Sequence, residues 1–136
     1  MVSTFAESMT SNPCNSNFGK IIAIEAKNQN FIKFLSIDVA VNIVSMQEMN
    51  LKTVNDYLLS IRQSKNNSLF FYCCNRIKKT LPDGEVVNFS EYGWLEKDEV
   101  LFDELCPWHQ KYYKARPPFY FSYDGPIKHK LVKFIK

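Results

Sequence analysis

The stretch SLFFYCCNRIKK, from Ser68 to Lys79, is a strongly β-prone run of aromatic, aliphatic and cysteine residues. The tetrapeptide LPDG, Leu81 to Gly84, follows it. Proline pre-sets φ and glycine accepts a positive φ, so these four residues are typical of a tight turn. The run EVVNFS, Glu85 to Ser90, then supplies a partner strand. The sequence therefore predicts a β-hairpin at this position.

Upstream of this hairpin, two further apolar runs indicate a second one. KIIAIEA spans Lys20 to Ala26 and FIKFLSI spans Phe31 to Ile37, with a polar quartet at positions 27–30 between them. Two β-prone runs separated by a short polar link are typical of paired strands. The following segment, Asp38 to Asn50, stays open between strand and helix because short apolar runs cannot be assigned by periodicity.

The clearest helix is expected over Thr53 to Ser64. Thr53 is suited to the N-cap, and Asp56 places a carboxylate in the first turn, where the helix dipole favours it. The apolar residues recur at helical spacing and form one stripe: Val54, Tyr57, Leu58 and Ile61. We expect this stripe to pack against the apolar faces of Phe31 to Ile37 and Leu69 to Phe71.

Two elements are expected nearer the C-terminus. FYFSY, Phe119 to Tyr123, and the run Ile127 to Ile135 flank Asp124-Gly125-Pro126, which predicts a C-terminal hairpin. The acidic-amphipathic segment Lys97 to Leu105 is compatible with a short helix. The acidic cluster Glu96, Asp98, Glu99, Asp103 and Glu104 is interpreted as a solvated helix face rather than a metal site.

Together these elements predict an α+β fold, a twisted antiparallel β-sheet of about five or six strands packed with one main helix. We expect a disordered N-terminal tail over residues 1–17, which is rich in Ser, Thr and Asn, and a single α+β domain over residues 18–136.

Composition narrows the class of protein. Hydrophobic residues make up 46% of the chain, which excludes a wholly disordered protein, and no apolar run is long enough to span a bilayer. The N-terminus lacks the features of a signal peptide. With four cysteines, two of them adjacent at Cys73 and Cys74, we expect free thiols in an intracellular, reducing compartment and no membrane partner.

Metal and catalytic motifs are weak in the sequence. Cys106-Pro-Trp-His109 has the two-residue gap of a zinc half-site, but the sequence shows no second half. Adjacent cysteines rarely ligate one ion together, and a lone buried cysteine is usually a small core residue. Glycine-rich phosphate loops and the common hydrolase motifs are missing. We therefore expect no metal, no cofactor and no enzymatic activity.

Cations interleaved with aromatic residues point instead to nucleic acid. On a strand, residues two apart share a face, so Arg76 would project with Lys78, and Lys128 with Lys130. If the two hairpins are neighbours, these cations would form a stripe matching a phosphate backbone. A second group, Lys111, Lys114 and Arg116, interleaves with Tyr112 and Tyr113. The competing interpretation is ordinary lysines on an exposed sheet face, since the net charge is only +3.

The order of several short motifs resembles that of a known family. The passage Phe70-Phe71-Tyr72, Asn75-Arg76, Lys78-Lys79 and Pro82-Asp83-Gly84 is similar to the "WYFF … RDRKYPNG" passage of the plant NAC transcription-factor domain. Tyr92-Gly93-Trp94 followed by Lys97-Asp98 resembles its "GYWKATGKDK", and residues 119–135 resemble its closing strands. The resemblance covers about residues 69–135, and the family's opening "LPPGFRF" has no counterpart.

The resemblance implies a homodimer that binds duplex DNA in the nucleus. It implies that a strand over Tyr92 to Asp98, carrying Trp94 and Lys97, enters the major groove, with Arg76, Lys78 and Lys79 as backbone anchors. The leading hypothesis is thus a non-enzymatic binding module, a DNA-binding transcriptional regulator. The alternative is a small protein-interaction factor, of the viral or bacterial accessory or immunity type, that acts by occupying a partner surface.

Overall fold

The computed structural model describes residues 2–4, 21–123 and 125–136. The predicted tail at residues 1–17 lies outside the described residues except for β1 (Val2–Thr4), which pairs in parallel with β2 (Ile21–Ala23). The chain divides into two compact units, residues 1–31 and residues 32–136, and each is described by itself.

The hairpin expected over residues 20–37 is wrong. Residues Ala26–Phe34 form 3-10 turns, interrupted at Asn28, instead of a second strand. In FIKFL the apolar residues stand at positions 31, 32, 34 and 35, a spacing that fits a helical turn as well as it fits a strand. Short apolar runs of this kind take the conformation that their surroundings favour.

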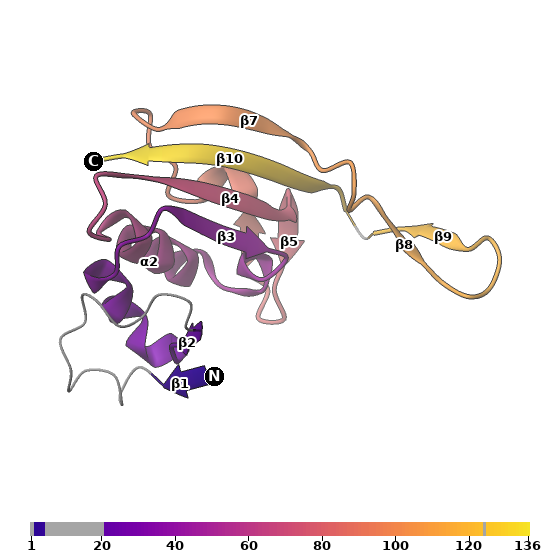
Figure 1. The fold of residues 1–136 in the computed structure, drawn as a ribbon. Coiled ribbons are helices and arrows are strands. Elements are labelled where there is room, and N and C mark those ends of the chain that lie inside the picture. Colours follow the sequence, from indigo (N-terminus) through magenta and orange to yellow (C-terminus); the bar gives the residue numbers. More distant parts are fainter. Residues whose placement is uncertain (1, 5–20, 124) are drawn as a thin grey trace. The chain divides into compact units, whose positions relative to one another are not determined.

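A four-stranded sheet forms the centre of the second unit (Figure 1). Its strands, in spatial order, are β3 (Val39–Ile43), β4 (Ser68–Arg76), β10 (Ile127–Ile135) and β7 (Glu99–Leu105). Strand β3 runs parallel to β4, whereas β10 is antiparallel to both β4 and β7. The sheet is therefore mixed, with β3 and β7 at its edges.

Two predictions for the C-terminal half are wrong. Strand β10 pairs with β4 and β7, not with residues 119–123. The acidic segment over 97–105, expected as a helix, contributes β7 instead. In this strand Glu99 faces Lys133, and Asp103 lies beside Lys128 and Lys130 of β10. Cross-strand charge pairing and non-local strand pairing thus override the local helical pattern.

The turn predicted at LPDG is confirmed, but only the end of the run Ser68 to Lys79 pairs across it. The larger part of that run, β4, pairs with β10 and β3 instead. Strand β5 (Lys78–Thr80) pairs antiparallel with β6 (Val86–Asn88). Gly84 has a φ of +92°, and its N–H donates to the carbonyl of Leu81 at 2.9 Å. A second two-stranded hairpin, β8 (Lys111–Tyr113) and β9 (Tyr120–Ser122), extends beyond the end of the sheet in Figure 1.

Helix α2 (Leu51–Arg62) confirms the predicted helix with shifted ends. Asn50, rather than Thr53, is the N-cap, and its side-chain oxygen accepts the N–H of Thr53 at 2.8 Å. The predicted stripe faces inward: Val54, Leu58 and Ile61 are buried. Further 3-10 turns lie at Met46–Glu48 and Phe89–Glu91.

Helix α2 lies along one face of the sheet in Figure 1, and the main core contains buried side chains from both. Leu69, Phe71 and Phe134 of the sheet pack there with the helix stripe, and Ile32 is packed against the same cluster. Cys73 belongs to this core, while Cys74, on the opposite face, joins a smaller cluster with Cys106 and Ile127.

The fold is mixed α+β, as the sequence predicts. The sheet has four strands and includes a parallel pair, so the finer expectation of a five- or six-stranded antiparallel sheet is not confirmed. Within the described residues, no helix combines the length and apolar character needed to cross a membrane.

Candidate functional site

Two of the predicted nucleic-acid cations, Lys128 and Lys130, do lie on one side of β10. Both approach the same carboxylate: Lys128 Nζ is 2.8 Å and Lys130 Nζ 3.5 Å from Asp103 of β7. The acid between them neutralises part of the charge that a phosphate would meet. The pair therefore carries less free positive charge than the sequence pattern indicates.

Trp94 lies beside these lysines. The ammonium of Lys130 stands 4.6 Å from the centre of the Trp94 ring, a cation–π distance. Trp94, Lys128, Lys130 and Asp103 line a shallow groove of about 300 Å³ together with Ile77 and Phe89. The structure thus brings three of the seven predicted site residues together.

The other four predicted residues do not join this group. Arg76 ends β4 and Lys78 opens β5, with a bend at Ile77 between them, so they are not neighbouring positions of one strand. Lys79 lies 3.5 Å from Glu48, and Lys97 is exposed in a turn. The continuous four-cation stripe expected from the sequence is not formed.

The predicted DNA-reading strand over Tyr92 to Asp98 is also wrong. These residues form turns, and Tyr92 and Asp98 are buried. Asp98 accepts two hydrogen bonds from the Arg62 guanidinium and one from the N–H of Leu95. Burial by itself would raise the pKa of Asp98, but the Arg62 and Leu95 bonds and the Arg62 charge hold it below its usual value. The segment is therefore anchored to α2 and is unsuited to entering a groove.

The β8–β9 hairpin carries a different concentration of aromatic side chains. In its register Tyr112 faces Phe121, and Tyr113 faces Tyr120, so the two pairs project to opposite sides. The Tyr112 and Phe121 rings stack at 5.7 Å, and Lys114 Nζ lies 4.9 Å from the Phe121 ring. This side is half-buried and holds the hairpin together.

The opposite side of the hairpin is open to solvent. Tyr113 and Tyr120 are 65% and 66% exposed, and Phe119 stacks beside Tyr113 at 6.4 Å. Lys111 shares this side because it is two residues from Tyr113 on the same strand. We call Lys111, Tyr113, Phe119 and Tyr120 the aromatic hairpin face.

The charged side chains within residues 107–122 are all cationic. Residues 107–122 contain Lys111, Lys114 and Arg116, all exposed, and no Asp or Glu. Trp108, which leads into β8, is 81% exposed. The sequence pattern had already shown cations interleaved with tyrosines here; the structure adds that the rings are displayed to solvent.

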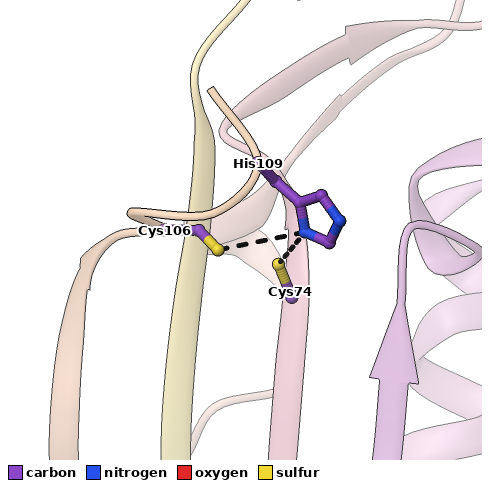
Figure 2. A group of neighbouring side chains, drawn as sticks. All are labelled: Cys74, Cys106 and His109. Carbon is purple, nitrogen blue, oxygen red and sulfur yellow. Dashed lines mark hydrogen bonds between the residues drawn. The ribbon is translucent and has the colours of Figure 1, made fainter. Parts of the chain in front are cut away.

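A second cluster lies at the base of the same hairpin (Figure 2). Cys74 of β4, Cys106 after β7 and His109 before β8 place their Sγ and Nδ1 atoms within 4.8 Å of one another. His109 Nδ1 is 3.7 Å from Cys74 Sγ and 3.9 Å from Cys106 Sγ. In Figure 2 both sulfurs point toward the imidazole ring.

The thiols in this region are buried, and none forms a disulfide among the described residues; Cys14 lies outside them. Burial is the main cause that raises the pKa of Cys74 to about 11, with the neighbouring Cys106 adding to it. Burial likewise raises the pKa of Cys73 to about 12, although Asn75 donates a hydrogen bond to it. Neither group is therefore a reactive thiolate at neutral pH.

Sequence reasoning missed Cys74 as a neighbour of Cys106 and His109. The Cys106-x-x-His109 spacing was the signal for half of the cluster, and no local pattern could supply the rest. Residue 74 reaches it only because β10 lies between β4 and β7, and because the chain turns back after Cys106.

No protein-family model, no curated protein and no solved structure matches this chain. The kinship with NAC domains stays a prediction, and the functional proposals rest on the chemistry of the described residues.

Proposed function

We propose that the protein is a non-enzymatic nucleic-acid-binding module that uses the aromatic hairpin face. The observation that carries this proposal is the pair of solvent-exposed rings, Tyr113 and Tyr120, on a hairpin whose charged residues over 107–122 are all cationic. Exposed aromatic rings beside cations suit stacking on bases together with contact to phosphates. A role in regulating transcription is the biological context that the sequence pattern favours.

The arrangement fits unpaired bases better than an intact duplex. A base can stack on Tyr113 or Tyr120 only where its own ring is accessible, as it is in a single strand or in a distorted duplex. Lys111, on the same side, and the exposed Arg116 are placed to meet the backbone phosphates. We therefore expect tighter binding to single-stranded than to duplex oligonucleotides.

The groove beside Trp94 is the second surface for the same function. Its cations share Asp103, so an incoming phosphate would compete with a carboxylate already in contact with both lysines. We assign this groove a supporting role, in which Lys128 and Lys130 extend the positive surface.

The test is a titration of fluorescent single-stranded and duplex oligonucleotides at several salt concentrations. Truncating both rings in a Tyr113→Ala/Tyr120→Ala variant removes the stacking platform. Stacking contributes about 1–3 kcal/mol per base, so we expect the dissociation constant to rise by roughly 10-fold or more. The affinity of the wild type should fall with salt, by a log–log slope of about −0.7 per phosphate contacted on a single strand.

The matched control is Tyr113→Phe/Tyr120→Phe, which keeps both rings and should bind like the wild type. In a Lys128→Ala/Lys130→Ala variant, the affinity should depend less steeply on salt concentration. Truncating the two rings in this background should weaken binding by the same factor as in the wild type. Wild-type binding weaker than about 10⁻⁴ M to every oligonucleotide, or an unchanged affinity after ring truncation, would refute the proposed function.

A protein-interaction factor is the second candidate, favoured by the open face of the sheet. The side chains of edge strand β3 that face away from α2 are exposed and apolar, and Phe70 of β4 continues this surface. The β3 members are Val39, Val41 and Ile43. Contiguous exposed apolar side chains commonly mark a protein-binding surface. Among the described residues β3 pairs only with β4, and an edge strand of this kind can pair with another chain.

A further inference from the structure

We propose that Cys74, Cys106 and His109 form a zinc-binding site that fastens the β8–β9 hairpin to the sheet. The proposal goes against the expectation of no metal drawn from the sequence. The zinc site is also separate from the proposed nucleic-acid-binding face. Its side chains lie at the base of the hairpin, whereas Phe119 of the aromatic hairpin face lies in the loop between β8 and β9.

The separations between the donor atoms match a tetrahedral zinc ion. With Zn–S bonds of about 2.3 Å and Zn–N bonds of about 2.0–2.1 Å, a sulfur and a nitrogen in one tetrahedral site lie about 3.5 Å apart. The two sulfur–nitrogen separations here are 3.7 and 3.9 Å. Both sulfur–nitrogen separations therefore exceed the tetrahedral value by only a few tenths of an ångström. The two sulfurs lie within 4.8 Å of each other, and two Zn–S bonds of about 2.3 Å would bring them to about 3.8 Å.

The chemistry of the donors also selects zinc. Two cysteine sulfurs and one imidazole nitrogen are soft and borderline ligands, which favour Zn²⁺ over Mg²⁺ or Ca²⁺. The thiols, protonated in the metal-free protein, would release their protons as the ion binds. Among the residues that the structure describes, no carboxylate belongs to the cluster. Three protein ligands leave a fourth tetrahedral position, which a water molecule can take on the partly exposed His109 side.

The loop that carries two of the ligands is held in place independently of the cluster. The side-chain amide of Gln110 donates to the carbonyls of Cys106 and Ile127, each at 2.7 Å, and the N–H of Cys106 donates to Ile127 at 3.0 Å. These bonds fix the turn that brings His109 back over Cys106. A site shaped before the metal arrives loses less conformational entropy on binding.

An ion at this position would join segments that are far apart in the chain. Cys74 belongs to the inner strand β4, whereas Cys106 and His109 lie in the segment between β7 and β8 that leads into the hairpin. The metal would therefore restrict the hairpin's motion about its base. Binding a ligand set that exists only in the folded state also stabilises that state.

The experiment measures metal on the full chain, purified under reducing conditions and freed of metal with a chelator. Cobalt(II) and zinc(II) are titrated separately. We expect one cobalt per chain, with the thiolate charge-transfer absorption and the visible bands of a tetrahedral ion, and displacement of cobalt by zinc. Native mass spectrometry should show one zinc per chain.

Substitutions then assign the ligands. Loss of a residue that only hydrogen-bonds to a metal ligand weakens metal binding by about 10–100-fold. We expect each of Cys74→Ala, Cys106→Ala and His109→Gln to weaken zinc binding by more than this. Cys73→Ala is the matched control, since it removes the adjacent thiol, which lies in the other core cluster, and it should bind zinc like the wild type. Circular dichroism of the metal-free variants checks that each is folded.

Three results would overturn the proposal. The first is that the folded wild type binds neither zinc nor cobalt stoichiometrically. The second is a Cys74–Cys106 disulfide in protein kept under reducing conditions. The third is zinc binding that survives Cys74→Ala but is lost in Cys73→Ala. The wild-type stoichiometry and spectrum decide the question even if a ligand variant fails to fold.

Discussion

The Arg62–Asp98 ion pair is buried and has several further partners. The Arg62 side chain also donates to the carbonyl of Gly93 at 3.0 Å and stacks 3.7 Å from the centre of the Phe134 ring. The Asp98 side chain is 1% exposed. One guanidinium thus fixes the turn after Trp94 to helix α2 and to strand β10 at the same time.

We predict that Asp98→Asn destabilises the fold by on the order of 3 kcal/mol at pH 7, because it leaves a buried guanidinium without its counter-charge. Asp98 has a lowered pKa in the folded state. Its contribution to stability is therefore complete above the unfolded value, near 4, and is lost as the pH falls through the folded value. The difference between wild type and variant should be constant from about pH 5 to 7 and shrink below about pH 4.

Urea unfolding at pH 7, 5 and 3.5 measures this difference. Asp56→Asn is the control, since Asp56 pairs with Lys52 at the surface, and its removal should change stability by at most about 0.5 kcal/mol. A pH-independent difference for Asp98→Asn would show that the carboxylate charge is not what stabilises the turn.

At the scale of elements, the two edge strands of the sheet have different surroundings. Strand β7 is rich in acids, and its Glu99 and Asp103 contact lysines of β10. Strand β3 instead exposes valine and isoleucine. Charges on an edge discourage pairing with another chain, whereas an apolar edge invites it. The two candidate functions therefore use different elements, the β8–β9 hairpin for nucleic acid and β3 for a protein.

If the β3 face is an interface between two copies of this chain, we expect Val41→Lys to raise the dimer dissociation constant at least 10-fold, because it places a charge inside an apolar contact. Sedimentation velocity over a concentration series measures this. Tyr113→Ala, on the hairpin, should leave the dimer unchanged. A wild type that is monomeric at high micromolar concentration would contradict the homodimer.

In the second unit as a whole, one core joins the four-stranded sheet, whose strands are far apart in sequence, to the single α-helix of the described residues. Leu58, which is 1% exposed, belongs to this core together with residues of β4 and β10 and with Tyr92. The surrounding side chains come from segments distant in sequence, so they cannot close readily over a void. Loss of this side chain should affect the entire second unit.

We predict that Leu58→Ala costs about 2–5 kcal/mol of unfolding free energy. Its neighbour Leu59 is 54% exposed, so Leu59→Ala should change stability by no more than about 0.5 kcal/mol. Equilibrium unfolding followed by both tryptophan fluorescence and circular dichroism compares the two. If the two substitutions lowered the unfolding free energy equally, the face of α2 that carries Leu58 would not be the one packed in the core.

Local sequence by itself determined the features that need only neighbouring residues. The LPDG turn, the stripe of α2, and the opposite orientation of Cys73 and Cys74 follow from glycine stereochemistry and from the helical and strand periods. Tertiary structure alone decided which strands pair: β10 joins β4 and β7, and the acidic segment becomes β7 because lysines of β10 lie opposite its carboxylates. The meeting of Cys74 with Cys106 and His109 follows from that pairing, and the outward display of Tyr113 and Tyr120 follows from the pairing of β8 with β9. Contacts of these kinds leave no periodic trace in the chain.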